Sequence, residues 1–148
     1  IIGVYQEGRR LELQKKITLN HTDLFGNFDR KVDVIVFNPP WLLAKHDLEE
    51  GIDKAMYYEE DLFPRFFEEA KKYLKEDGKL VLIFSNLAQE VDNQTAHPII
   101  KELQNNNRFR KDLHLRREVR ASSRRTQRTD SRETEKVELW VLAHKKVK

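Results

Sequence analysis

The stretch VDVIVFNPPW, residues 32–41, decides how this chain folds and where its site lies. Residues 32–37 form a nearly continuous apolar run rich in β-branched side chains, which is typical of a strand buried on both faces of a parallel sheet. The prolines at 39 and 40 donate no backbone hydrogen bond, so the strand cannot continue through them. We therefore expect Asn38 at the carboxyl end of a buried strand, where open α/β sheets place their ligand sites.

The four residues that follow the strand suit a planar amino group. The side-chain carbonyl of Asn38 and the main-chain carbonyl of Pro39 would accept both hydrogens of such a group and orient its lone pair for attack. Pro40 locks the turn, and Trp41 would stack on a flat substrate. The alternative interpretation is a rigid Pro-Pro turn with a partly buried Trp41 and no ligand.

A helix and a second strand are predicted downstream. Apolar side chains recur at three- and four-residue steps over 62–76, which predicts a helix with Pro64 in its first turn and Gly78 as its stop signal. Residues 79–84 then form a second buried strand. A strand, a helix and a strand in this order indicate a right-handed parallel crossover.

The remaining patterns are less regular. Residues 17–25 predict a strand, residues 42–60 a loop or broken helix that forms either a lid or a plain acidic surface, and residues 98–106 a weaker helix. Alternation over 112–119 and 136–143 predicts two further strands.

Composition places the chain among single-domain proteins with solvated surfaces. It has 148 residues, 39% of them hydrophobic and 36% charged, so residues 1–148 are expected to form one domain. No apolar run is long enough for a bilayer, and no membrane partner is expected. The absence of cysteine favours the cytoplasm. The five histidines show no paired ligand spacing, so no metal site is expected.

Positive charge is concentrated near the C-terminal end. Residues 108–148 hold 14 of the 28 Lys and Arg against 6 acidic residues. This asymmetry indicates an anionic partner, and we expect a mobile basic loop over 121–135. The candidate nucleic-acid contacts are Arg116, Arg117, Arg120, Arg124, Arg125 and Arg128. A solvated loop that binds nothing is the alternative.

The motif resembles the substrate-binding motif of the class I S-adenosylmethionine-dependent N-methyltransferases, (Asn/Asp)-Pro-Pro-(Tyr/Phe/Trp). The resemblance covers residues 17–144 and is specific at 38–41. It implies an α/β, doubly wound, mostly parallel sheet with an antiparallel C-terminal strand. It implies Asn38, Pro39, Pro40 and Trp41 as catalytic residues, and Asp23, Leu24 and Asn38 as contacts of the cofactor S-adenosylmethionine.

Two departures from the family pattern limit what the resemblance implies. Trp41 stands where Tyr or Phe is commoner, and the five glycines allow no G-x-G for the cofactor's methionine end. We therefore expect a C-terminal part of a longer methyltransferase, with an incomplete cofactor site.

Three functions stay open at this point. The basic C-terminal third favours methylation of nucleic acid, with RNA ahead of DNA. A protein glutamine is the second acceptor class. A non-catalytic RNA-binding module is the third.

Overall fold

The structure is a computed structural model that describes residues 16–44, 57–119 and 134–146. In this part of the chain a four-stranded sheet has the order β1-β4-β6-β5, formed by β1 (Val32–Phe37), β4 (Leu74–Ser85), β6 (Lys136–His144) and β5 (Phe109–Glu118). A second, two-stranded sheet pairs β2 (Leu42–Leu43) with β3 (Tyr57–Tyr58). The helices are α2 (Leu62–Tyr73), α3 (Leu87–Val91) and α4 (Pro98–Asn105).

The sheet is mixed rather than mostly parallel, which corrects the prediction. β1 and β4 are parallel, whereas β6 runs antiparallel to both β4 and β5. The expected strand over 17–25 is also wrong, because this segment turns through hydrogen bonds from Gly26 N to Asp23 O and from Phe28 N to Phe25 O. Within the described residues β1 pairs only with β4, so no parallel neighbour extends the sheet beyond β1.

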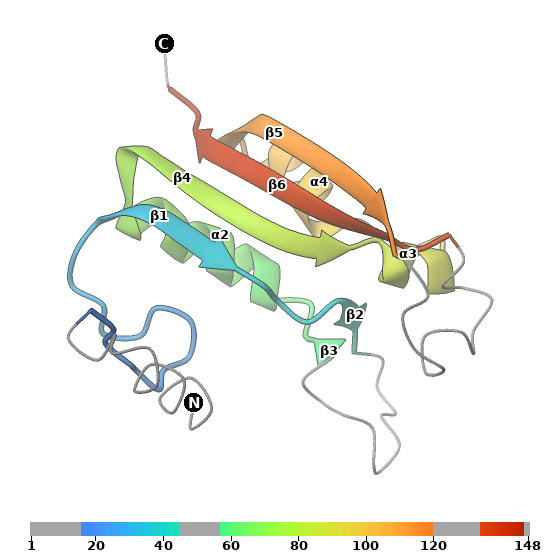
Figure 1. The fold of residues 1–148 in the computed structure, drawn as a ribbon, viewed down its shortest axis with the longest axis horizontal. Helices are drawn as coiled ribbons and strands as arrows, with labels where there is room; N and C mark the ends of the chain where they lie inside the picture. Colours follow the sequence, from blue (N-terminus) through green and yellow to red (C-terminus); the bar gives the residue numbers. More distant parts are fainter. Residues whose placement is uncertain (1–15, 45–56, 120–133, 147–148) are drawn as a thin grey trace.

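Helices α2 and α4 lie on the same face of the sheet (Figure 1). The crossover β1–α2–β4 and the helix over 98–106 are confirmed by these elements. The core forms where the helices meet alternate residues of the strands, with Phe67 of α2, Leu82 of β4 and Leu142 of β6 almost fully buried. Burial at a spacing of two is the pattern that the pleat of a strand imposes.

The opposite face of the sheet carries exposed apolar side chains. Val34 and Val36 of β1 and Leu113 and Leu115 of β5 are between 43% and 66% exposed. No helix in 16–44, 57–119 or 134–146 covers them, so the second helical layer of a doubly wound fold has no counterpart in the described part.

Three boundaries differ from the prediction. Helix α2 ends at Tyr73 because Leu74 is extended (φ −82°, ψ 133°) and pairs with Val32 of β1. Residues 42–43 and 57–58 form short strands, while 45–56 lie outside the described residues. At the end of the expected mobile loop, Glu135 is buried and accepts a hydrogen bond from Ser85 Oγ at 2.8 Å. Residues 121–133 lie outside the described part.

Gly78 lies inside β4 and is not a helix stop signal. An added Cβ would lie 2.9 Å from Asp33 O of the neighbouring strand and 2.7 Å from Leu74 Cδ1. The register between β1 and β4 shifts at this point, between Val32 and Val34. Glycine is therefore required by a close approach of two backbones.

We expect Gly78→Ala to lower the free energy of unfolding by about 1–3 kcal/mol, the usual cost of overpacking. Urea denaturation followed by circular dichroism measures it, with the exposed neighbour Asp77→Ala as the matched control. A denaturation midpoint for Gly78→Ala equal to that of the unsubstituted protein would show that β1 and Leu74 can shift to accommodate the added methyl group without a loss of stability.

Candidate functional site

The Asn-Pro-Pro-Trp turn leaves β1 at the end of the sheet toward which β1 and β4 both point (Figure 1). Asn38 is exposed, and Pro39 directly after it is buried, so the turn is anchored while the carboxamide faces solvent. Pro40 is half-buried, and Trp41 is partly buried against the core. Part of the Trp41 side chain therefore packs against the core, so less of its surface is available to stack on a substrate.

A pocket of about 420 Å³ adjoins this turn. It brings Asp23 and Pro40 together, although they are far apart in the sequence, and Phe37 joins them from the end of β1. The other lining residues come from β3 and the start of α2: Tyr57, Tyr58, Glu59, Asp61, Leu62 and Arg65. We take this motif pocket as the candidate site. Asn38 itself does not line the pocket, but it directly follows Phe37, which does.

Leu24 does not line the motif pocket. Its φ of +50° lies in the left-handed region that a side chain rarely adopts, and the side chain packs against the core. Its predicted cofactor contact therefore remains a prediction, and its visible role is to turn the chain after Asp23. Pro39 and Trp41 are likewise absent from the pocket's lining.

Arg65 holds Asp23 in place. The Arg65 Nη2 atom donates to both carboxylate oxygens of Asp23, at 2.8 and 2.9 Å, and Nη1 lies 3.5 Å from Asp61 Oδ2. This ion pair joins residues 42 positions apart, so sequence analysis missed it. The only local signal was the i,i+4 spacing of Asp61 and Arg65 at the start of a predicted helix.

The motif pocket is predominantly acidic. Three carboxylates, those of Asp23, Glu59 and Asp61, face one guanidinium among its lining residues. Such a lining attracts a cation and opposes phosphate groups. Burial raises the pKa of the Tyr58 phenol from its ordinary value of 10.0 to about 12, still further above physiological pH. Tyr58 therefore lines the pocket as a neutral side chain and is not suited to act as a general base.

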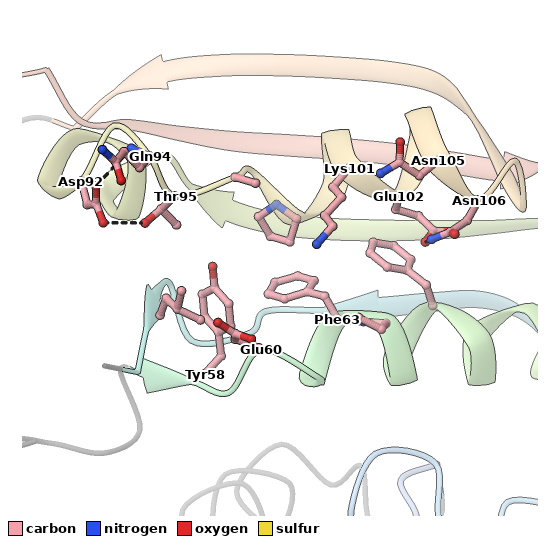
Figure 2. Close-up of a pocket in the computed structure, with 15 residues that line it drawn as sticks. Tyr58, Glu60, Phe63, Asp92, Gln94, Thr95, Lys101, Glu102, Asn105 and Asn106 are labelled. Carbon is pink, nitrogen blue, oxygen red and sulfur yellow. Dashed lines mark hydrogen bonds between the residues drawn. The ribbon is translucent and has the colours of Figure 1, made fainter. Parts of the chain in front are cut away.

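A larger groove of about 490 Å³ lies on the other side of Tyr58, between α2 and α4 (Figure 2). Phe63 and Phe67 of α2 give it an apolar floor. Its polar rim contains Glu60, Asp92, Gln94, Thr95, Lys101, Glu102, Asn105 and Asn106. Tyr58 lines both spaces, and the groove likewise has more carboxylates than cations in its lining, with Glu60, Asp92 and Glu102 against Lys101.

The predicted arginine contacts divide into two groups. Arg120, Arg124, Arg125 and Arg128 lie outside the described residues. Arg116 and Arg117 are neighbours on β5, so their side chains point to opposite faces. Arg116 Nε lies 2.9 Å from Glu138 Oε1 and is already part of an ion pair.

A single buried carboxylate, that of Glu138, lies beneath Arg116 and is surrounded by polar partners. Glu138 of β6 is 1% exposed. Its Oε2 accepts from Trp140 Nε1 at 2.7 Å and lies 3.1 Å from His97 Nε2 and 3.3 Å from His114 Nε2. Burial by itself raises the pKa of Glu138, but the hydrogen bonds from His97 and Trp140 and the charge of Arg116 outweigh it and lower the pKa to about 2. The sequence showed only an alternating strand here, with one acid on its apolar face.

Metal and membrane signals are absent from the described part. No group of three His, Cys, Asp or Glu side chains in 16–44, 57–119 and 134–146 could hold a metal ion. None of the helices described has the length and apolarity needed to cross a bilayer.

The family model of the Eco57I restriction-modification methylases matches residues 5–119, which is most of the chain. The chain belongs to this family. It therefore falls among the S-adenosylmethionine-dependent methyltransferases, as the Asn-Pro-Pro-Trp motif predicted.

Curated relatives of this methylase chain share its sequence over about half its length. A protein of Methanocaldococcus jannaschii, whose name assigns it to the protein N5-glutamine methyltransferases, is 36% identical over 81 residues, which are 50% of this chain and 40% of that protein. The release factor glutamine methyltransferase of Streptococcus pneumoniae is 32% identical over 77 residues, 45% of this chain and 28% of that protein.

A solved structure supports the fold. The ribosomal protein L11 methylase of Lactobacillus delbrueckii subsp. bulgaricus matches 97% of this chain and 53% of its own, with a TM-score of 0.50 and 20% identity. The chain thus has an α/β methyltransferase-like fold. It spans about half the length of that solved structure and less than half the length of the two curated relatives.

The charge of the motif pocket fits the sulfonium part of S-adenosylmethionine better than its methionine carboxylate. A sulfonium cation fits a pocket with three carboxylates and the ring of Tyr57, since cations are attracted to both. The same carboxylates repel the carboxylate of the cofactor's methionine end. Asp23, Pro40 and Tyr57 would therefore lie beside the adenosyl and sulfonium part.

Proposed function

We propose that this chain forms the acceptor side of an S-adenosylmethionine-dependent N-methyltransferase site, and that the acceptor is the side-chain amide of a protein glutamine. One observation carries the proposal: Asn38 is exposed at the carboxyl end of β1, between Phe37, which lines the motif pocket, and the buried Pro39. An amide nitrogen is planar, and its two hydrogens match two carbonyl acceptors.

The task of these residues is positioning. The Asn38 side chain and the Pro39 carbonyl would accept the two N–H groups and turn the nitrogen toward the electrophile. S-adenosylmethionine supplies, when bound, a methyl group on a positively charged sulfur. The acidic lining of the motif pocket favours that charge, and the amide gives up one proton to solvent after the new N–C bond forms.

The charge of the site supports a protein acceptor. Phosphates of a nucleic-acid substrate would meet the carboxylates of the motif pocket and of the adjoining groove. The two curated relatives are also named for glutamine methylation. Nucleic acid remains the second candidate acceptor, because the matching family model is that of a restriction-modification methylase and because the C-terminal third is basic.

A labelling assay distinguishes the acceptors. The protein, or a longer natural protein that contains this chain, is incubated with methyl-tritiated S-adenosylmethionine and a cell extract, half of which has been treated with nucleases. We expect label in the protein fraction of both halves and N5-methylglutamine in its hydrolysate by mass spectrometry. Label that disappears with nuclease and elutes as a methylated base would establish the second candidate instead. Absence of label from both fractions would favour the non-catalytic module.

A further inference from the structure

A third pocket, of about 460 Å³, lies between helix α4 and the edge strand β5. Its apolar wall is made by Ile100 and Leu103 of α4 with Phe109 and Trp140 of the sheet. The polar lining residues are Gln104, Arg110, Lys111, His114, Arg116 and Lys145. It lies three strands from β1, about 14 Å at the usual strand spacing, and shares no lining residue with the motif pocket.

The charges in this α4–β5 pocket are all positive. Four cations and no carboxylate line it, in contrast to the acidic motif pocket. The side chain of Lys111 makes no hydrogen bond or ion pair with another residue of the described ranges, although its backbone belongs to the β5–β6 ladder. Lys145 Nζ donates only to the neutral Asn107 Oδ1, at 2.6 Å. Arg116 lies 2.9 Å from Glu138 Oε1 through its Nε atom, and its side chain is about half exposed.

A bulge in β5 brings Lys111 and Arg116 to one face, whereas Arg110, the neighbour of Lys111, points to the other face and pairs with Asp112. The register between β5 and β6 shifts between Lys111 and Leu113, so His114 and Arg116 come to the same face as Lys111. Without the extra residue, alternation would place Leu113 and Leu115 there instead. Burial lowers the pKa of His114, with smaller contributions from the charges of Arg116 and Lys111, against the opposing effect of the Glu138 carboxylate.

We propose that the α4–β5 pocket binds the backbone phosphates of a single-stranded nucleic acid, separately from the methyl acceptor site. From Lys111 to Arg116 the cations extend about 15 Å along an edge strand, which exceeds a single phosphate group and suits a chain of them. Arginine forks and lysine ammonium groups are the usual partners of phosphate oxygens. The apolar wall offers a surface for sugars and bases. This proposal does not depend on which acceptor is methylated.

Binding of a fluorescein-labelled 12-nucleotide oligouridylate, followed by anisotropy from 50 to 300 mM KCl, tests it. The double variant Lys111→Gln/Lys145→Gln should bind at least tenfold more weakly at 50 mM salt. Its plot of log affinity against log salt should be shallower by about 1.4, since each cation removed from a single-strand site contributes about 0.7. The matched control is Lys72→Gln/Lys75→Gln, which removes the same charge from exposed lysines paired with Glu68 and Asp33.

Three results would overturn the proposal. The first is an unchanged salt slope in Lys111→Gln/Lys145→Gln, or an equal change in the control. The second is competition by polyglutamate as strong as that by RNA at equal charge, which would assign the pocket to an acidic protein segment. The third is equally tight binding of uridine monophosphate, which would assign it to a free nucleotide. Melting temperatures of both double variants exclude unfolding as the cause.

Discussion

Asn38→Ala should slow methyl transfer by about 30- to 1,000-fold while leaving the fold intact. A single positioning or charge-stabilising group contributes about 2–4 kcal/mol to the barrier in enzymes of this kind. Asn38 is exposed, so its truncation removes little packing, and the free energy of unfolding should change by no more than about 0.5 kcal/mol. Single-turnover kinetics with a preparation that transfers methyl groups measures the first quantity, and urea denaturation measures the second.

The matched control is Asn27→Ala, another exposed asparagine, in the turn before β1 and outside the lining of the motif pocket. It should retain full activity. Cofactor affinity in Asn38→Ala should fall far less than turnover, because the lost acceptor holds the substrate amine rather than the cofactor. Equal turnover in Asn38→Ala and the unsubstituted protein would reduce the Pro-Pro turn to a structural element.

Glu138→Ala should lower the free energy of unfolding by about 3–5 kcal/mol, the cost of removing one member of a buried ionic network. The substitution leaves the Trp140 indole and the His97 ring without their acceptor inside the core. His97 also takes part in a second hydrogen bond. Its Nδ1 accepts the Ile100 N–H at the start of α4, so the ring proton resides on Nε2 and points to Glu138. Helix α4 and strand β6 are thus joined through one imidazole.

Acid should abolish this contribution in a defined pH range. The pKa of Glu138 in the folded protein is about 2, below its ordinary value of 4.5. The carboxylate therefore stabilises the fold fully above about pH 4.5, and the contribution is lost as the pH falls from there toward 2. Urea denaturation at pH 7 and at pH 3 should show that the difference in free energy of unfolding between the unsubstituted protein and Glu138→Gln is smaller at pH 3.

The exposed Glu76 of β4 is the control for this pair of experiments, and Glu76→Ala should change stability by no more than about 0.5 kcal/mol at pH 7. A Glu138→Ala protein as stable as the control variant would show that the histidines and the indole find other partners.

Local pattern was enough to predict most of the elements. The apolar run before Asn38 predicted β1, the three- and four-residue spacing predicted α2, and alternation predicted the antiparallel strand of 136–143. The predictions of α2 and of the strand over 136–143 hold because an element that covers a core must carry apolar side chains at its own period. The prediction that β1 is buried on both faces is wrong in the described part, because Val34 and Val36 are exposed. The motif and its position after β1 also followed, because prolines end a strand by removing its donors.

The predictions failed where hydrogen bonding depends on a neighbour. Residues 17–25 have the composition of a strand, but in the described part they do not pair with the free edge of β1, and the chain turns from Asp23 to Phe28 instead. Gly78 has the composition of a helix stop, but its reason is the backbone of Asp33 in the adjacent strand. Neither neighbour can be recognised from the local sequence.

By itself the sequence determined the strand, helix and strand around Asn38, the family, and the chemistry of the motif, since each depends on residues that are close together in the chain. Only the tertiary structure decided which distant charges meet. Strand order and register place Arg65 on Asp23, gather two histidines on Glu138, and turn Lys111 and Arg116 to one face through a single bulged residue. The physical reason is that the energy of a charge depends on its neighbours within a few ångströms, and folding chooses those neighbours from the whole chain.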